Sequence, residues 1–245
     1  MEGWLVNDKL TCIPGTRTLW NMLLDGIPGL VDMTSGSYDT LPKKVTDAAF
    51  IHLPDYIIRN ATYFRPLYLP VPTISLVQDS CMGWTLEQQR STCASSDLVV
   101  YNSEYTRQMY QDQEHLPSVV IPVGTDFEKF KPGPEVQRET VMFVGSTNPI
   151  KGWDFLKRVI EASDLEFVVV LKDGPVLQPK ATVHASVSQE KIARLASSCS
   201  VGICTSVSET QHLAGIEMGA CGLPLLTPNV GVYHGRQPGV GGRTT

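Results

Sequence analysis

Two glutamates near the C-terminal end of the chain, Glu209 and Glu217, enclose the run ETQHLAGIE. If this run is helical throughout, a rise of about 1.5 Å per residue separates the carboxylates by roughly 12 Å, with about 80° between their directions. Carboxylates accept hydrogen bonds from hydroxyl groups. The pair therefore suits a ligand that carries hydroxyls about that far apart, and a sugar nucleotide has that reach.

A second source of chemistry is the start of the helix predicted over 212–221. The first turn of a helix combines backbone N–H groups that lack intrahelical partners with the positive end of the helix dipole, which suits a diphosphate. We expect His212, Leu213 and Ala214 to donate these N–H groups. Lys151 follows an Asn-Pro turn and begins another predicted helix, so its ammonium group can reach the same phosphates as a point charge.

The elements that must position these groups alternate along the chain. Short apolar runs are followed by amphipathic runs, which is the pattern of strands and helices in a parallel α/β sheet. A serine cap at Ser103 marks the start of one helix. Strands are predicted at 4–6, 73–77, 97–101, 119–122, 140–144, 167–171, 182–185, 201–204 and 224–227, and helices at 16–25, from 104, between 145 and 166, at 189–197 and at 212–221.

This alternation is interrupted by the polar, proline-containing stretch 131–139 and then restarts. The sequence therefore predicts two domains, residues 1–132 and 133–245, each a Rossmann-like unit. The expected fold class is α/β, with two parallel sheets that face each other across a cleft above their carboxyl ends, where such folds bind ligands. Lys151 and Glu209 are therefore expected to lie on strand-to-helix loops.

Composition narrows the class of partner. The chain of 245 residues is 42% hydrophobic with a net charge of −5, which predicts a globular protein without the basic surface that nucleic acids and anionic membranes require. The six cysteines form no CxxC pair, and the first ten residues lack the pattern of a signal peptide, so we predict a reduced, cytoplasmic protein. No DxD motif is present, and a divalent metal is not expected.

Three segments carry a resemblance to a known family. They are IPVGTDFEKFKP (121–132), FVGSTNPIKGWDFL (143–156) and SETQHLAGIEMGACGLPLL (208–226). In this order they resemble the interdomain segment, the first strand-loop-helix of the second domain and the Glu-seven residues-Glu element of GT-B glycosyltransferases, most of all the retaining family 4 enzymes. VVVLKDGP (168–175) and SDLVVYNSEYT (96–106) are weaker matches.

The resemblance implies a retaining glycosyltransferase that moves a sugar from a UDP- or GDP-type donor to an acceptor hydroxyl of a glycan, lipid or protein, without a metal or other cofactor. Glu209 would hold the transferred sugar, Glu217 the ribose, and Lys151 the leaving diphosphate. Asp79 would face the acceptor. The implied catalytic residues are Glu209, Lys151 and His52, and the implied donor-binding residues are Gly15, Arg17, Gly145, Ser146, Lys151, His184, Ser186, Glu209, His212, Leu213, Ala214 and Glu217.

The chain departs from the family at Ser146, where an arginine is usual. One of two expected phosphate cations is therefore missing. Either another basic residue substitutes, with Arg17 the nearest candidate by topology, or phosphate binding is weakened. Several assignments also have a simpler alternative: a solvated helix face for the two glutamates, a solvated cap for Lys151, an ordinary turn for Gly15, and a packed side chain for His52. Asp79 has loop capping as its simpler alternative.

Other functions are open at this point. A nucleotide-sugar-binding module without transferase activity is the main alternative, and a sugar-nucleotide epimerase or a phosphorylase on the same two-domain plan is a weaker one. The motifs GxGxxG, GxxxxGK, GxSxG and HExxH are absent, so dehydrogenase, P-loop, serine-hydrolase and zincin functions lack their usual support.

Overall fold

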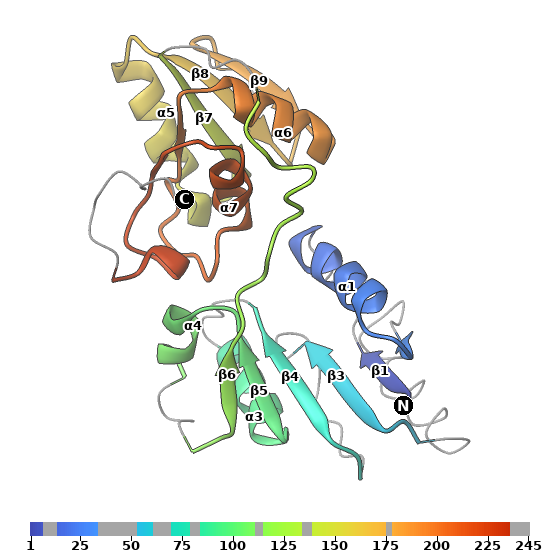
Figure 1. Cartoon of the computed structure of the whole chain (residues 1–245). Coiled ribbons are helices and arrows are strands. Elements are labelled where there is room, and N and C mark those ends of the chain that lie inside the picture. The colour runs from blue at the N-terminus through green and yellow to red at the C-terminus, as the bar shows by residue number, and fades with distance from the viewer. Residues whose placement is uncertain are drawn as a thin grey trace. The chain divides into compact units, whose positions relative to one another are not determined.

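The computed structural model describes residues 1–6, 14–33, 53–60, 70–78, 84–110, 115–133, 139–174 and 178–235. The chain separates into two compact units, Met1–Val123 and Gly124–Thr245 (Figure 1). Each unit is built on one sheet whose paired strands all run parallel. The predicted α/β class with two Rossmann-like units is confirmed.

The first unit holds a six-stranded sheet in the order β2-β1-β3-β4-β5-β6. Helix α1 covers one face of this sheet through a cluster that includes Leu5, Ile58 and Leu76. Helix α3 contributes Cys93 to the cluster on the other face, with Tyr101. The elements are β1 (Gly3–Val6), α1 (Pro14–Gly26), β2 (Leu30–Asp32), β3 (Tyr56–Asn60), β4 (Thr73–Val77), α3 (Trp84–Ala94), β5 (Leu98–Tyr101), α4 (Glu104–Gln108) and β6 (Ser118–Val120).

The second unit holds a five-stranded sheet in the order β11-β10-β7-β8-β9. A short 3₁₀ turn, η3, precedes α5, and a second one, η4, follows β11. The elements are β7 (Thr140–Gly145), η3 (Pro149–Lys151), α5 (Trp153–Ala162), β8 (Glu166–Leu171), β9 (Ala181–Ala185), α6 (Gln189–Ser198), β10 (Val201–Ile203), α7 (Leu213–Ala220), β11 (Leu225–Leu226) and η4 (Gly231–Tyr233).

Both faces of the second sheet are covered by helices. Phe143 of β7 packs with Trp153 and Leu156 of α5 on one face, whereas Met142 of β7 packs with residues of α6 and α7, among them Met218, on the other face (Figure 1). Burial on two faces explains why β7 and β8 are almost continuously apolar rather than alternating. These two strands form the centre of the unit from which the site loops leave.

The two units divide between Val123 and Gly124, whereas the sequence pattern places the division after Pro132. Phe130, between these points, is 1% exposed and packs in the core of the second unit. An aromatic side chain buried in this way ties the joining segment to the second unit.

Most predicted elements agree with the structure to within one or two residues at each end, and Ser103 caps α4 by accepting the N–H of Thr106 at 3.1 Å. Among the described strands and α-helices, three were not predicted: β2, β3 and α3. The helix predicted from His212 begins one residue later, at Leu213.

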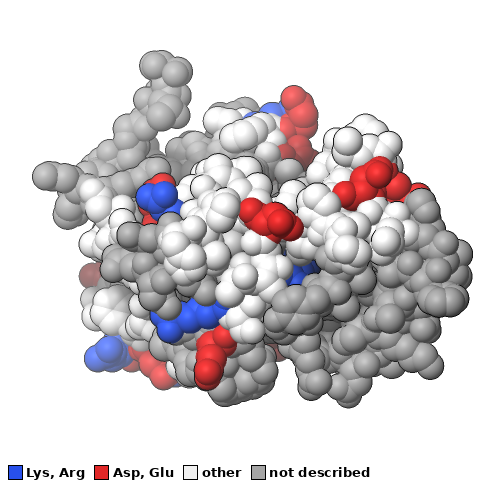
Figure 2. Space-filling view, turned by 90° about the horizontal axis from the view of Figure 1, so that it is seen from below, with Lys and Arg blue, Asp and Glu red and all other residues white. Residues whose placement is uncertain are grey.

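None of the described helices is both long and apolar enough to cross a membrane. The cysteines of the described part, Cys93, Cys199, Cys204 and Cys221, are free and buried. On the face drawn in Figure 2, the described acidic and basic side chains lie scattered among uncharged ones. This distribution agrees with the low net charge of the sequence.

Candidate active site

The loops that carry the predicted site leave one edge of the second sheet. Strands β7, β8 and β9 end level with one another, because Gly145 pairs with Leu171 and Leu171 pairs with Ala185. Parallel strands have their carboxyl ends at the same edge. The β7–α5 loop (146–152) and the β10–α7 loop (204–212) therefore begin on neighbouring strands of one edge.

Lys151 is positioned by a tight turn. The side chain of Asn148 accepts the N–H of Ile150 at 2.9 Å, and Pro149 occupies the first position of η3, where its fixed φ and missing N–H are favourable. Gly152 then ends η3 in the left-handed conformation, with φ of 68°. The turn thus presents Lys151 at the start of α5.

The two site loops are tied together through backbone contacts. Thr205 donates its hydroxyl to the carbonyl of Lys151 at 2.7 Å, and the N–H of Val207 bonds the carbonyl of Ile150 at 2.8 Å. A Cβ on Gly152 would lie 1.9 Å from the carbonyl oxygen of Thr205. Only glycine fits here, both for its φ and for this close approach.

We therefore expect Gly152→Ala to destabilise the second unit by at least about 2 kcal/mol, through left-handed strain and displacement of Thr205. Chemical unfolding followed by circular dichroism measures this change in the free energy of unfolding. Gly219→Ala is the matched control. Gly219 lies inside helix α7, and a methyl added there would meet only Leu225, at 3.7 Å. Equal stability of the two variants would contradict the role assigned to the Gly152 contact.

At the junction of the two loops, Lys151 forms an ion pair with Glu209. Its Nζ lies 2.6 Å from Glu209 Oε1, and that oxygen also accepts the hydroxyl of Ser206 at 2.7 Å. The Glu209 side chain is 8% exposed and that of Lys151 is 35% exposed. The second oxygen, Oε2, makes no hydrogen bond within the part of the chain that the structure describes.

The run from Glu209 to Glu217 is not one helix, which corrects the expectation based on helical spacing. Glu209 lies in the loop before α7, and His212 has a left-handed backbone with φ of 61° and ψ of 65°. The separation of 12 Å and the angle of 80° therefore do not apply. Glu209 is also buried and paired, so it is not a charge on a solvated helix face.

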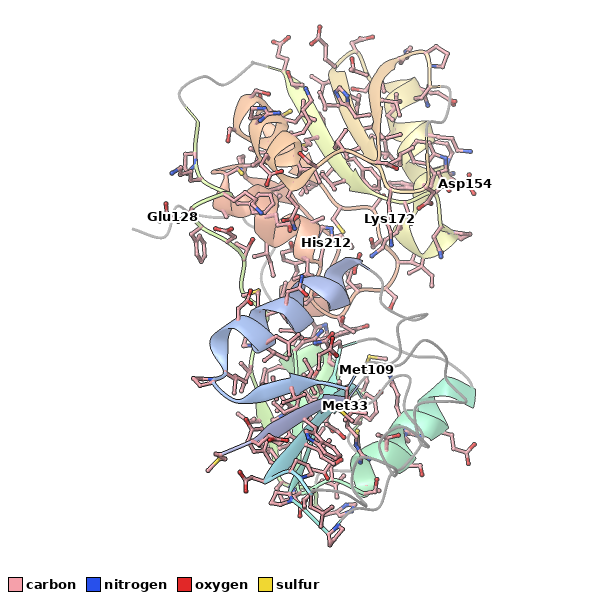
Figure 3. All side chains as sticks on the ribbon, turned by 90° about the vertical axis from the view of Figure 1, so that its right-hand side faces the viewer. Met33, Met109, Glu128, Asp154, Lys172 and His212 are labelled. Carbon is pink, nitrogen blue, oxygen red and sulfur yellow. The ribbon has the colours of Figure 1, made fainter. Side chains whose placement is uncertain are left out.

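His212 precedes the first turn of α7 (Figure 3). It is 8% exposed. Burial lowers the pKa of His212 to about 4; Glu209 opposes this shift and Lys151 adds to it. The ring is therefore neutral at pH 7. The N–H groups of Leu213 and Ala214 have no hydrogen-bond partner among the described residues, so this helix end offers two donors to an anion.

Glu217 lies one helical turn beyond these donors, on α7. It is partly buried, and burial raises the pKa of Glu217 from 4.5 to about 7, while Lys129 opposes the rise. The described part of the chain supplies its carboxyl group with no hydrogen bond. Glu217 is therefore a carboxyl group that is costly to ionise until a ligand hydroxyl is bound beside it.

This raised pKa predicts how stability depends on pH. Between about pH 4.5 and about 7 the folded chain binds a proton at Glu217 that the unfolded chain has released, so the free energy of unfolding falls as pH rises through this window. Glu217→Gln should remove this fall, and the variant should gain on the order of 1 kcal/mol or more over the wild type between pH 5 and pH 8.

Urea unfolding at four pH values tests this expectation. The control is Glu161→Gln, an exposed position on α5. We expect the control to change the free energy of unfolding by the same amount at every pH. If Glu217→Gln behaves in the same way, the pKa of Glu217 is not raised.

Neither a protein-family profile nor a curated protein matches the sequence significantly. Solved structures do match. Sucrose-phosphate synthase from Thermosynechococcus elongatus superposes with a TM-score of 0.68 at 13% identity, over 96% of this chain and 83% of that one. WaaG, a glycosyltransferase involved in lipopolysaccharide biosynthesis, gives a TM-score of 0.69 at 11% identity, over 96% of this chain and 82% of that one.

A third match is the pneumococcal O-GlcNAc transferase GtfA, solved with UDP and GlcNAc, with a TM-score of 0.59 at 16% identity. It covers 76% of this chain and 44% of GtfA, so the present chain spans less than half of that protein. The matched structures are GT-B glycosyltransferases. The chain has the GT-B fold.

In this GT-B chain, the structure brings part of the predicted site together. Lys151 contacts Glu209 directly, and ligand atoms of Glu209 and His212 lie within 4.8 Å of each other. Leu213 and Ala214 follow at the start of α7. The sugar-holding, phosphate-binding and backbone-donating candidates thus converge at one junction of two loops.

Four other predicted residues of the GT-B chain lie at or near the same sheet edge. Gly145 ends β7, His184 is partly buried in β9, and Ser146 accepts the N–H of Asn148 at 3.4 Å. Ser186 follows β9 with φ of 48°. Among the described residues, none of the four hydrogen-bonds Lys151 or Glu209.

Four further predictions lie beyond what the structure describes. His52 and Asp79 are outside the described residues of the GT-B chain. Gly15 and Arg17 belong to helix α1 of the first unit, but the exposure of Gly15 and the side chain of Arg17 are outside the description. The roles of these four residues stay predictions.

The sequence pattern missed three residues that lie at or near this candidate site. Ser206 precedes Glu209 by three positions, and its Ser-x-x-Glu spacing, which resembles a capping box, was an available local signal. Tyr233 contacts His212 from a distant turn and gave no local signal. Lys172 is exposed and follows β8 directly (Figure 3). Its backbone N–H donates to the carbonyl of Gly145 at 3.0 Å, so this cationic residue lies beside the end of β7, which Ser146 follows.

Proposed function

We propose that this chain is a metal-independent, retaining glycosyltransferase that uses a nucleoside diphosphate sugar of the UDP or GDP type. The observation that carries the proposal is the Lys151–Glu209 pair, which leaves Glu209 Oε2 without a hydrogen bond in the described part, next to the open first turn of α7. The chemistry needed for a phosphate and for a sugar hydroxyl thus meets at one point.

Each group suits one part of the donor. The N–H groups of Leu213 and Ala214 and the ammonium of Lys151 would hold the diphosphate. Glu209 Oε2 would accept a hydroxyl of the transferred sugar, and Glu217 would accept hydroxyls of the ribose. GtfA, solved with UDP and GlcNAc, is a structural neighbour consistent with this class of ligand.

The proposed reaction exchanges one bond for another at the anomeric carbon. The bond from that carbon to the diphosphate oxygen breaks, the acceptor oxygen bonds to the same face of the sugar, and the leaving phosphate takes the proton of the acceptor hydroxyl. Negative charge grows on the phosphate in the transition state, and the ammonium of Lys151 would stabilise that charge. The acceptor would be a hydroxyl of a glycan, a lipid or a protein.

Metal independence is part of the proposal. Ligand atoms of Cys204, Glu209 and His212 lie within 4.8 Å of one another, a set that suits zinc by its chemistry. However, Glu209 Oε1 already faces the ammonium of Lys151, and burial raises the pKa of the Cys204 thiol, which opposes the thiolate a metal needs. Lys151 thus occupies the place where a metal would neutralise this carboxylate.

The proposal is tested by incubating the full chain with UDP-, GDP- and ADP-sugars and measuring release of the nucleoside diphosphate, with EDTA in a parallel series. We expect release from one donor class, unchanged by EDTA and lost in Glu209→Ala. Binding of a donor without release by the wild type would instead indicate a nucleotide-sugar-binding module. Release that EDTA abolishes and zinc restores would overturn metal independence.

A further inference from the structure

The backbone of His212 is unusual among the residues around the site. It is one of three described residues other than glycine with a positive φ, and it takes this conformation just before the first turn of α7. A residue with a side chain seldom adopts the left-handed region unless surrounding contacts hold it there. The contacts that hold His212 therefore decide where the N–H groups of the next residues point.

The main contact comes from Tyr233, in the η4 turn. The Tyr233 hydroxyl lies 3.1 Å from His212 Nδ1, and the two rings meet edge to face with centroids 5.7 Å apart. The imidazole is neutral at pH 7, as described above. In either neutral tautomer Nδ1 can pair with a hydroxyl, because a hydroxyl both donates and accepts.

Two glycines make this contact possible. A Cβ on Gly215 would lie 2.1 Å from the Tyr233 hydroxyl and 2.3 Å from His212 Nδ1, so the pair sits directly against the backbone of α7. Gly231 has φ of 58°, and a Cβ there would lie 2.8 Å from the carbonyl oxygen of Thr210. The η4 turn is thus packed against the loop that contains Glu209.

From this arrangement we propose that Tyr233 is a positioning residue for the diphosphate. It holds the His212 ring, the ring keeps the backbone of His212 left-handed, and this backbone aims the N–H groups of Leu213 and Ala214 at the phosphates. The inference rests on the proposed function, since it assigns those N–H groups to a diphosphate. Tyr233 itself does not touch the ligand.

The test compares a nucleoside diphosphate with its nucleoside. UDP, GDP and ADP are titrated into the full chain by calorimetry, and the tightest of them is compared with the matching nucleoside. Tyr233→Phe removes only the hydroxyl, and we expect it to raise the Kd of the diphosphate about two- to ten-fold, as loss of one hydrogen bond does, while the Kd of the nucleoside stays the same. A purely structural role would weaken both ligands equally.

A double-mutant cycle with His212→Gly separates positioning from direct contact. Glycine adopts a positive φ without a ring to hold it, so Tyr233→Phe should have no further effect on diphosphate affinity in that background. A persisting effect would show that Tyr233 acts on the ligand itself and would overturn the inference. Should Tyr233→Phe fail to fold, Gly215→Ala, whose methyl separates the pair, should give the same selective loss.

The inference and the proposed function fail in different ways. A wild-type chain that binds no diphosphate more tightly than its nucleoside contradicts the phosphate site, and the proposed function falls with it. A wild type that prefers the diphosphate, with the same preference in Tyr233→Phe and Gly215→Ala, contradicts the positioning role alone.

Discussion

Replacing Lys151 by methionine should lower kcat about 10²- to 10³-fold, the usual loss when one group that stabilises transition-state charge is removed. Methionine keeps much of the volume of the side chain but removes the charge that faces the leaving phosphate. The same variant should weaken binding of the nucleoside diphosphate more than binding of the nucleoside. Steady-state rates of nucleoside diphosphate release and calorimetric titrations measure the two effects.

Lys157→Met is the matched control for this experiment. Lys157 lies six residues further along and is also in a close ion pair, 2.7 Å from Asp154, on the exposed side of α5. We expect its kcat and its diphosphate affinity to stay within about two-fold of the wild type, because exposed pairs contribute little. Equal losses of diphosphate and nucleoside affinity in Lys151→Met would remove the phosphate role of Lys151.

Glu209→Gln should lower kcat/KM about 100-fold, the size expected for a hydrogen bond to a charged group in a buried site. The amide keeps the shape of the carboxylate but loses its charge, so a sugar hydroxyl loses an anionic acceptor and Lys151 loses its partner. Because an ion pair whose carboxylate is buried is broken, the variant should also unfold more readily. Rates are therefore compared at temperatures well below its unfolding transition.

The control for Glu209 is Glu166→Gln, at the first residue of β8 and so at the opposite edge of the same sheet. It should retain full activity. A Glu209→Gln variant with normal turnover would show that the carboxylate serves only to hold Lys151, and the sugar-holding role would be withdrawn. A joint Lys151→Met, Glu209→Gln variant should lose less than the product of the two single losses, because the two side chains act as a pair.

The strands of the second unit were predictable because the sheet is covered on both faces. Burial on both sides selects nearly continuous apolar runs, and Thr140–Gly145 and Glu166–Leu171 follow this rule. Strand β3 was missed because Arg59 interrupts its apolar pattern. That guanidinium is fully buried and donates to Ser75 Oγ at 2.9 Å and to the Thr92 carbonyl at 2.6 Å, partners that no local pattern reveals.

Helix α3 was missed for a related reason. Its sequence, WTLEQQRSTCA, has no clear apolar stripe, and its buried positions include Gln89 and Thr92. Polar residues are buried where long-range hydrogen bonds satisfy them. Their burial is therefore a property of the assembled unit and not of the helix alone.

For the site, the sequence by itself predicted which residues could carry the chemistry, and those roles stay predictions. It also determined that Lys151 and Glu209 fall on strand-to-helix loops, because apolar periodicity fixes where parallel strands end. Only the tertiary structure decided that these two side chains, 58 positions apart, form a pair. It also decided that His212 is left-handed and held by Tyr233. These features depend on which strands are neighbours and on close backbone contacts such as that of Gly152 with Thr205, and such contacts exist only after the chain has packed.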